Sequence, residues 1–433
     1  MAPELFPYQI EGAKWLRGKR HALLADQPGL GKSAQAIEAA KSFARILVVC
    51  PAVAVANWHR EFKKFDPTRT SPPIVVSYDF LIRHAHEYQS PRDLLILDEA
   101  HFLKSPTASR TKAVFGRKET GGLIHSSERT WLLTGTPAPN NASELWVFLF
   151  TFGMTRLSYD AFVDRYCNSY LVSRFGRRQI VGTNLKHVSE IKTMLAQISL
   201  RRLKADVLKE LPPIFHSTVA LESHYDPLKD FPEMKDKLGL ELERMKEALG
   251  VNLDVEPTIE ALEVLAQSVS TLRRYHGLKK VAPVVELVTD ELLNGHYKKI
   301  VLFCVSRDVS KMLVAALSRF NPVFITGETP QHSRQAVVDR FQTDDDCQVF
   351  VGNIRAAGTA ITLTAANQVA FVESEWTPAD MAQAADRCHR IGQKDVVNVR
   401  HFALAGSIDE KIAATLSRKA QELSHFILPT DQK

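Results

Sequence analysis

Short apolar runs alternate with helical patterns from the beginning of the chain. Runs of this kind, bounded by polar residues or by Gly and Pro, are typical of buried strands. The first part of the chain has them at residues 21–25 (HALLA), 46–50 (ILVVC), 94–98 (LLILD) and 130–135 (TWLLTG). The alanine-rich stretch at residues 33–44 has helical spacing. Strands that alternate with helices predict a parallel sheet covered on both faces.

The pattern changes between about residues 158 and 280, where helical spacing predominates. Residues 227–250 and 258–274 read as helices. A hairpin is also predicted, with strands at residues 170–173 and 179–181 on either side of the basic turn RFGRR. We interpret this section as helical insertions that project from the main body.

The alternation of strands and helices then returns. Strand candidates stand at residues 300–304, 323–326, 348–352, 369–373 and 398–403. The acidic residues 344–346 are expected in an exposed turn between a helix and a strand. The sequence therefore predicts an α/β fold with two parallel-sheet units. We divide it into residues 1–155, a middle section of insertions and link at 156–280, and residues 281–433.

Composition narrows the class of protein. A chain of 433 residues suggests more than one domain, and 45% hydrophobic with 24% charged residues is typical of a soluble globular protein. The five cysteines are widely spaced without a C-x-x-C, which argues against a zinc site or a disulfide framework. The first residues show no basic region followed by an apolar stretch, and no run of eighteen apolar residues occurs, so we expect neither export nor membrane insertion. The net charge of +6 fits a polyanionic partner, but many enzymes share it.

The first candidate site is DQPGLGKS, residues 26–33, between a predicted strand and a predicted helix. Backbone N–H groups of a glycine-rich turn can surround a phosphate chain, and a helix N-terminus adds favourable partial charge. Lys32 would contact the β- and γ-phosphates of a nucleotide, and the Ser33 hydroxyl would coordinate Mg²⁺. Asp26 occupies the position of the first glycine in the strict pattern. The alternative is a plain glycine-rich turn with a surface lysine.

The second candidate is LLILDEAH, residues 94–101, where an apolar strand ends in two carboxylates. Ligands bind at the carboxyl edge of parallel sheets. Asp98 would hold Mg²⁺, directly or through water, and Glu99 would orient and deprotonate the attacking water. The alternative is a pair of acids that cap a helix.

Two further segments carry candidate chemistry. In TGTPAPNN, residues 134–141, Thr134 and Thr136 could relay changes at the nucleotide towards nucleic acid, although Gly, Pro and Asn also make plain turns. In QAADRCHRIGQ, residues 383–393, Arg387 and Arg390 would share one face of a helix. Two guanidinium groups could clamp a phosphate or stabilise a transferring phosphoryl group. The alternative for this pair is a solvated basic surface.

In this order, the motifs resemble the Swi/Snf family of superfamily-two ATPases, over about residues 4–425. Further similar segments stand at residues 5–16 (LFPYQIEGAKWL), 48–65, 199–213 (SLRRLKADVLKELPP) and 352–367, and DRCHRIGQ matches the sixth helicase motif. Gln27, Pro28 and Ser33 depart from the usual phosphate loop without removing a functional group, and Ala360 stands where the family usually has glycine. The segments at 165–170, 182–187 and 354–364 resemble the annealing-helicase-like branch.

The resemblance implies two RecA-like lobes that bind ATP and Mg²⁺ between them. It assigns nucleotide contacts and metal ligands to Gln9, Gly29, Leu30, Gly31, Lys32, Ser33 and Asp98. It assigns catalysis to Lys32, Asp98 and Glu99 with Arg387 and Arg390 of the second lobe. The implied partner is double-stranded DNA, forked or branched DNA included, contacted mainly at its phosphates. Candidate DNA contacts are Ser77, Tyr78, Lys104 and the hairpin turn at residues 174–178.

We therefore expect a DNA-dependent ATPase that translocates on double-stranded DNA and remodels DNA structures or protein–DNA complexes. One alternative is an RNA helicase of the same superfamily, which would usually carry Ser-Ala-Thr where this chain has Thr-Gly-Thr-Pro. The other is a catalytically silent DNA-binding scaffold, which would need a damaged site. We further expect a monomeric, cytoplasmic and nucleoid-associated motor without an appended reader domain, as in bacterial or phage members.

Overall fold

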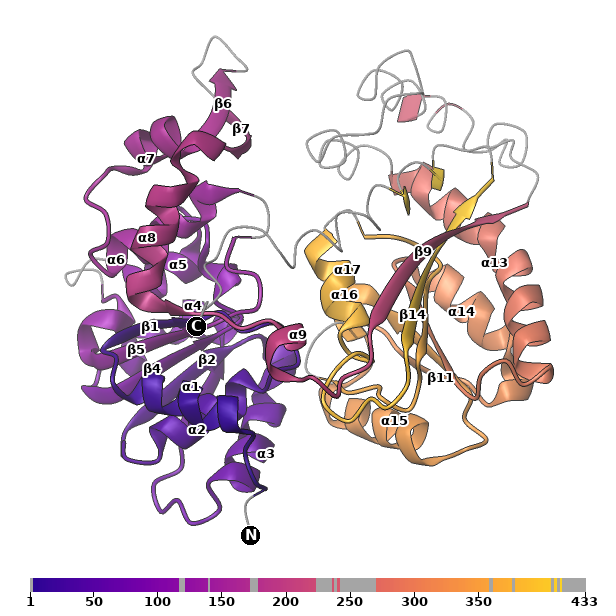
Figure 1. Cartoon of the computed structure of the whole chain (residues 1–433), viewed down its shortest axis with the longest axis horizontal. Helices are drawn as coiled ribbons and strands as arrows, with labels where there is room; N and C mark the ends of the chain where they lie inside the picture. The colour runs from indigo at the N-terminus through magenta and orange to yellow at the C-terminus, as the bar shows by residue number, and fades with distance from the viewer. Residues whose placement is uncertain are drawn as a thin grey trace. The chain divides into compact units, whose positions relative to one another are not determined.

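The chain folds into two compact units, the first ending at Lys209 and the second beginning at Glu210. Figure 1 colours the chain from indigo at the N-terminus to yellow at the C-terminus. This computed structural model describes residues 3–116, 121–138, 141–171, 178–222, 236, 240–241, 270–357, 361–375, 378–405, 409–410 and 413–414.

The first unit is built on a parallel sheet with strand order β3-β2-β4-β5-β1-β8. Its strands are β1 (His21–Leu24), β2 (Ile46–Cys50), β3 (Ile74–Ser77), β4 (Arg92–Asp98), β5 (Ser127–Leu133) and β8 (Ser199–Leu200). Its α-helices are α1 (Pro7–Arg17), α2 (Lys32–Ala40), α3 (Val55–Phe65), α4 (Tyr78–His84), α5 (Ser109–Phe115), α6 (Trp146–Thr151), α7 (Tyr159–Tyr166), α8 (Val188–Ile198) and α9 (Lys204–Val207). A separate antiparallel hairpin pairs β6 (Cys167–Leu171) with β7 (Arg178–Thr183).

The second unit repeats this plan, with a parallel sheet of order β11-β12-β10-β13-β14-β9. Its strands are β9 (Ile214–Leu221), β10 (Ile300–Cys304), β11 (Val323–Ile325), β12 (Val349–Asn353), β13 (Gln368–Phe371) and β14 (Val397–Leu404). Its α-helices are α13 (Ser270–Leu293), α14 (Arg307–Ala316), α15 (Gln331–Thr343), α16 (Ile354–Ala357) and α17 (Pro378–Ala385).

Short 3-10 helices complete the connections of both units. They are η1 (Ala52–Ala54), η2 (Ala85–Tyr88), η3 (Ala100–Leu103), η5 (Leu123–Ser126), η6 (Ala142–Leu145), η7 (Leu185–His187) and η9 (Ser318–Phe320).

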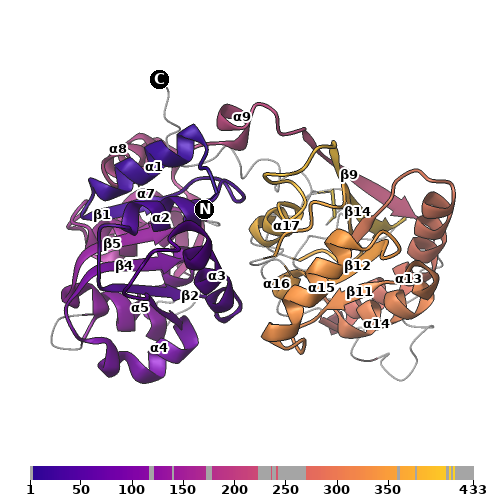
Figure 2. The ribbon, with the colours of Figure 1, turned by 90° about the horizontal axis from the view of Figure 1, so that it is seen from below.

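Both sheets are buried on both faces, as their continuous apolar runs predict. In β10, Val301 and Phe303 pack into one core cluster, whereas Ile300, Leu302 and Cys304 pack into another. Successive side chains of a strand point to opposite faces, so these clusters lie on opposite sides of the sheet. In Figures 1 and 2 the strands of each sheet lie among helices of the same unit. The predicted α/β fold with two parallel-sheet units is confirmed.

The predicted middle section contains more strand than expected. Its β8 extends the first sheet beside β1, and its β9 closes the edge of the second sheet beside β14. The hairpin is confirmed, while residues 172–177 of its turn lie outside the described residues. The predicted helix at 227–250 lies outside them apart from short helical pieces, and so do residues 258–269 of the helix predicted at 258–274, whose last residues 270–274 lie in α13. The predicted boundaries at residues 155 and 280 stay predictions.

Three smaller expectations can also be compared with the structure. All five cysteines belong to the described part of the chain and are buried free thiols. Among the described residues, no helix is both long enough and apolar enough to cross a membrane. The acidic turn at residues 344–346 lies between α15 and β12, as predicted.

Candidate functional site

Four loops of the first unit leave the sheet at the same edge. In the strand register, Leu24 of β1 is paired with Leu133 of β5 and with Leu200 of β8, and Leu133 is paired with Asp98 of β4. The strands are parallel, so their carboxyl ends meet there. The phosphate loop (residues 26–33), the acidic pair, the Thr134 segment and the segment after β8 therefore start side by side.

The phosphate loop has the backbone that its sequence predicts. Gly29 and Gly31 have φ angles of 89° and 74°, which only glycine adopts without strain. Lys32 is the first residue of α2, directly after Gly31. A Cβ atom at Gly31 would lie 2.4 Å from Nε2 of Gln9, so a larger residue would have to displace that side chain. The strand–turn–helix setting of the predicted site is thus present.

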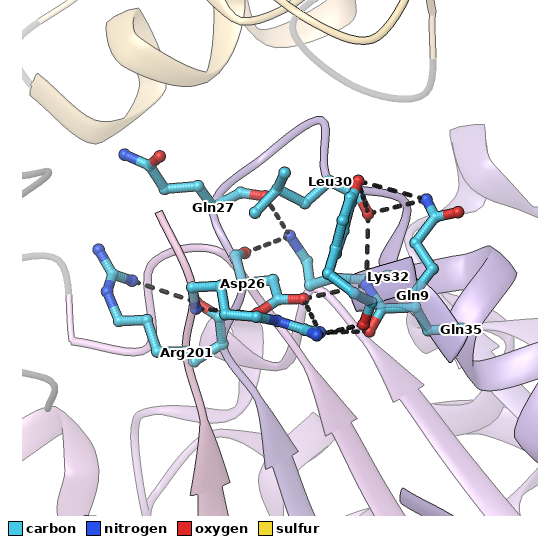
Figure 3. Close-up of polar contacts among 10 residues, drawn as sticks. Gln9, Asp26, Gln27, Leu30, Lys32, Gln35 and Arg201 are labelled. Atoms are coloured by element: carbon cyan, nitrogen blue, oxygen red, sulfur yellow. Dashed lines mark hydrogen bonds and ion pairs between the residues drawn. The ribbon is translucent and has the colours of Figure 1, made fainter. Parts of the chain in front are cut away.

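Lys32 and Gln9 both contact the backbone of this loop (Figure 3). Lys32 Nζ donates to the carbonyl oxygen of Asp26 at 2.8 Å and lies 3.5 Å from that of Gln27. Gln9 is 4% exposed, and its Nε2 donates to the carbonyl oxygen of Leu30 at 3.1 Å. The half-buried Ser33 follows Lys32 in the first turn of α2.

The acidic pair at the end of β4 is held by a side chain that the sequence did not single out. Trp58 of α3 donates from Nε1 to Oδ2 of Asp98 at 2.8 Å, and the backbone N–H of Glu99 donates to Oδ1 at 3.0 Å. Burial, followed by the neighbouring Glu99 charge, raises the pKa of Asp98 to about 6. The indole bond and the charge of Lys32 oppose this rise in pKa.

Glu99 has a φ angle of 48°, one of two positive values at non-glycine residues among those described. Such left-handed backbone is uncommon outside glycine and often marks functional positions. The Glu99 carboxylate lies 3.3 Å from Nδ1 of His101, which in turn lies 3.2 Å from the hydroxyl of Thr134. Thr136 donates its backbone N–H to the same hydroxyl at 3.2 Å. The acidic pair is therefore connected to the predicted threonine relay, of which Pro139 and Asn140 lie outside the described residues.

The second unit carries the predicted arginines, but not on a helix. Helix α17 ends at Ala385, and residues 386–393, here called the arginine turn, form successive turns and bends. The prediction that Arg387 and Arg390 share a helix face is wrong, because the chain turns before either residue. Arg387 is buried, and Arg390 donates from Nη1 to the carbonyl oxygen of Ile361 at 3.0 Å. Neither is the freely solvated surface arginine of the alternative interpretation.

The candidate DNA contacts differ in how much surface they offer. Tyr78 is 3% exposed, and its hydroxyl donates to the carbonyl oxygen of Asp98 at 2.8 Å. It is thus part of the support of the acidic pair, and its prediction as a surface contact is wrong. The Ser77 hydroxyl accepts a hydrogen bond from the backbone N–H of Phe80, and Ser77 is the residue directly before α4. Lys104 forms an ion pair with Glu144, while residues 174–177 lie outside the described residues.

Sequence reasoning missed the residues that hold this site together, chiefly Trp58, Gln35 and Arg202. Gln35 Nε2 donates to Oδ2 of Asp26 at 3.0 Å, and Arg202 forms an ion pair with the same carboxylate at 2.6 Å. One signal was available. An acidic residue in place of a buried loop glycine needs a buried cation, because an unpaired buried charge is costly.

Comparison with known protein families agrees with the family resemblance of the motifs. The model of the SNF2-related domain matches residues 8–72 and 66–226, and that of the helicase conserved C-terminal domain matches residues 280–392. The first match spans more than half of the chain. The Swi/Snf resemblance of the motifs is therefore confirmed.

Individual relatives agree with this result. A Caenorhabditis elegans homolog of "SWI/SNF-related matrix-associated actin-dependent regulator of chromatin subfamily A-like protein 1" is 30% identical over 466 residues, which cover 99% of this chain and 62% of the relative. The "DNA annealing helicase and endonuclease ZRANB3" of Mus musculus is 29% identical, over 96% of this chain and 40% of the relative. This chain thus spans less than two thirds of either relative. Both are animal proteins, and the predicted bacterial or phage origin stays a prediction.

A solved structure, "Sulfolobus solfataricus SWI2/SNF2 ATPase core in complex with dsDNA", aligns over 98% of this chain and 94% of that chain, with 24% identity and a TM-score of 0.44. The assignment rests on the family match and not on this alignment. The chain belongs to the SNF2-related family.

Proposed function

We propose that this protein is a DNA-stimulated ATPase that moves along double-stranded DNA. The observation that carries the proposal is the meeting of the phosphate loop with the Asp98–Glu99 pair at one edge of the first sheet. Phosphoryl transfer needs mainly positioning and charge stabilisation, and these loops supply a lysine, hydroxyl groups and two carboxylates. An ATPase site is the simplest use of that set.

Nucleotide and metal would be held by groups of suitable chemistry. The positive φ angles of Gly29 and Gly31 leave room for a phosphate chain against the backbone, with Lys32 at the start of α2. Hard oxygen ligands suit Mg²⁺, and we assign them to Ser33 and Asp98. Bound Mg²⁺ would neutralise charge on the β- and γ-phosphates. Gln9, which lies against Leu30, is proposed to contact the adenine.

Glu99 is the proposed general base, and Arg387 and Arg390 are the proposed phosphate-binding cations of the second unit. Glu99 has a left-handed backbone, and its carboxylate lies 3.3 Å from Nδ1 of His101, which would orient it. The two arginines would stabilise negative charge on the transferring phosphoryl group. We propose that nucleotide binding draws the two units together and that hydrolysis releases them, which would move the units along one strand of a duplex.

The DNA partner is supported by the relatives and by charge. The mouse relative is named as a DNA annealing helicase, and a net charge of +6 favours a polyanion. We propose double-stranded DNA as the track, forked or branched DNA as a further substrate, and a monomer as the active form. Contacts mainly to phosphates would make binding sensitive to salt.

The proposal can be tested by measuring ATP hydrolysis without nucleic acid, with duplex DNA, with single-stranded DNA and with RNA. We expect stimulation by duplex DNA that is lost in Lys32→Ala and in Glu99→Gln. Lys41→Ala, which removes an exposed lysine paired with Glu38 just after the same helix, is the matched control and should keep the stimulation. Displacement of a third strand from a triplex would report translocation directly, and an annealing assay beside it would reveal strand pairing.

Two outcomes would contradict the proposal. Stimulation by RNA alone would make the protein an RNA helicase. Binding of DNA without ATP hydrolysis under any of these conditions would make it a silent scaffold.

A further inference from the structure

The segment that begins with β8 contacts the rear of the phosphate loop and leads to the second unit. We infer that Arg202 is a positioning residue that couples phosphate binding in the loop to this connecting segment, residues 199–209. The inference rests on the proposed function, because it requires phosphate to bind at Lys32. It goes beyond that function by assigning a role to a residue that would touch neither nucleotide nor DNA.

Arg202 forms a buried ion pair with Asp26 of the phosphate loop. The Asp26 side chain is fully buried, and Arg202 donates to it from Nε at 3.1 Å and from Nη2 at 2.6 Å. The same guanidinium donates to Oε1 of Gln35 at 2.7 Å and to the backbone carbonyl of Tyr8. A planar guanidinium suits such a fixed, multiple contact, whereas an ammonium does not.

This pair explains how an acid can replace the loop glycine. A carboxylate in a phosphate loop would repel phosphate if its charge were free. Here the charge is turned towards Arg202 and matched by it, inside the unit. Asp26 thus becomes a fixed anchor of the loop instead of an obstacle to an anionic ligand.

Hydrogen bonds connect this ion pair to the middle of the loop. The carbonyl oxygen of Leu30 accepts from Tyr8 Oη at 3.1 Å, from Gln9 Nε2 at 3.1 Å and from Gln35 Nε2 at 3.3 Å. Gln35 Nε2 also donates to Asp26 (Figure 3). Helices α1 and α2 therefore fix the loop from behind, and Arg202 contacts residues of both helices as well as Asp26.

The connecting segment also forms hydrogen bonds with the loop beyond the ends of the strands. The N–H of Gln27 donates to the carbonyl of Arg202 at 3.1 Å, and the N–H of Arg202 donates to Oδ1 of Asp26 at 3.0 Å. The N–H of Lys204 donates to Oε1 of Gln27 at 2.6 Å. Arg201 donates to the carbonyls of Ala25 and Gly135, both at 3.2 Å. Helix α9 starts at this point, shortly before the second unit.

Lys32 supplies the link to phosphate. Its ammonium donates to the carbonyl of Asp26 and lies near that of Gln27, the two residues that hold the connecting segment (Figure 3). A phosphate oxygen is the stronger partner for an ammonium, so nucleotide binding should draw Lys32 away from these carbonyls. The hydrogen bonds of the Asp26 and Gln27 backbone then change, and the connecting segment is bonded to the N–H of Gln27 and to the side chains of both residues.

Hydrogen–deuterium exchange of residues 199–209 tests the inference, in the full chain with and without a non-hydrolysable ATP analogue and Mg²⁺. In the wild type we expect the analogue to change the exchange rate of this segment by roughly fivefold or more, the lower end of usual coupling between sites. In Arg202→Gln and in Asp26→Asn the analogue should still bind, but the change should be lost. The double variant should be no worse than either single variant, because the pair acts as one unit.

Arg69→Gln is the matched control for a merely structural role. The Arg69 side chain is 8% exposed, pairs with Asp66 at 2.7 Å and donates to the carbonyls of Ala40 and Phe43. Its variant should lose thermal stability yet keep the exchange response. Arg202→Lys, which keeps the charge, should recover part of the response and serves as a second variant if Arg202→Gln folds poorly.

The outcomes separate the inference from the proposed function. If the wild type binds the analogue and the exchange of residues 199–209 does not change, the coupling is overturned while the ATPase proposal stands. If Arg202→Gln keeps the full response, Arg202 is not the coupling residue. If the wild type binds no nucleotide, the proposed function fails and the inference fails with it.

Discussion

The phosphate loop of the first unit and the arginine turn of the second unit are held in place by different chemistry. The loop depends on an ion pair, Asp26 with Arg202, in which both side chains are nearly or fully buried. The arginine turn is held in part by a neutral side chain. Gln393 donates from Nε2 to the carbonyls of Thr364, Ala366 and Cys388, at 3.3, 2.9 and 3.2 Å.

The comparison shows two ways of presenting a cation to phosphate. In the loop, the supporting ion pair is charged, and its arginine belongs to residues 199–209, which lead to the second unit. It can therefore transmit a change in nucleotide binding. In the arginine turn, His389 donates to the carbonyl of Pro212 at 2.7 Å and Gln393 satisfies backbone carbonyls. These bonds fix the turn inside its own unit. We therefore expect the arginines to set the rate, and the loop to set the coupling.

The largest expected effect is on the arginines. Replacing Arg390 or Arg387 by Gln should lower kcat for DNA-stimulated ATP hydrolysis by about 10³-fold, since an arginine that stabilises phosphoryl transfer contributes on this scale. ATP affinity, measured by fluorescence with a labelled analogue, should change little. Arg307→Gln is the control, because Arg307 forms an exposed pair with Glu328 and should leave kcat unchanged. A loss of affinity with unchanged kcat would assign these arginines to ground-state binding instead.

The next effect concerns the protonation of Asp98, the proposed Mg²⁺ ligand at the end of β4. Because the pKa of Asp98 is raised to about 6, the carboxylate that Mg²⁺ requires is present above pH 6 and is lost as the pH falls through it. Each pH unit below 6 should weaken Mg²⁺ binding about tenfold, since one proton competes with the metal. Titration of Mg²⁺ into the protein between pH 5 and pH 8 would measure this. An affinity independent of pH over that range would remove Asp98 from the metal site.

A smaller effect follows from the indole that supports Asp98. Trp58→Phe removes a hydrogen bond that lowers the pKa of Asp98, so the midpoint of the Mg²⁺ titration should rise by roughly half a pH unit to one unit. Trp131→Phe is the matched control, because Trp131 is also buried in the first unit and donates to the carbonyl of Lys19. If both variants shift the midpoint equally, the shift results from lower protein stability and not from a change in the pKa of Asp98.

The part of the fold that could be predicted from sequence is the centre of each sheet. The central strands β1, β2, β4 and β10 are continuous apolar runs, and all were predicted. The missed strands β3, β8 and β9 all lie at sheet edges. Edge strands are partly exposed, as the 53% exposure of Ile74 and the 57% exposure of Phe215 illustrate, so the pattern of a buried strand is weaker there, although the edge strand β11 was predicted.

The same distinction holds within the site. Lys32, Asp98 and Glu99 lie in local motifs whose chemistry is readable from a few residues. Their supports are distant partners in the sequence, as with Arg202 and Asp26, which lie 176 positions apart. Local spacing was also misleading in the arginine turn, where a three-residue interval suggested a helix that ends before Arg387. Such turns are fixed by side chains that reach across the fold, which periodicity does not report.

The smallest expected effect tests whether the support of the arginine turn is only structural. Gln393→Met has a similar volume but cannot donate, which leaves three backbone carbonyls of the second unit short of a partner. The cost should be about 1–3 kcal/mol of unfolding free energy, measured by urea denaturation. At a temperature where the variant is folded, its exchange response in residues 199–209 should equal that of the wild type. A lost response with intact nucleotide binding would mean that the arginine turn transmits the nucleotide state as the phosphate loop does, and the contrast between the two supports would fail.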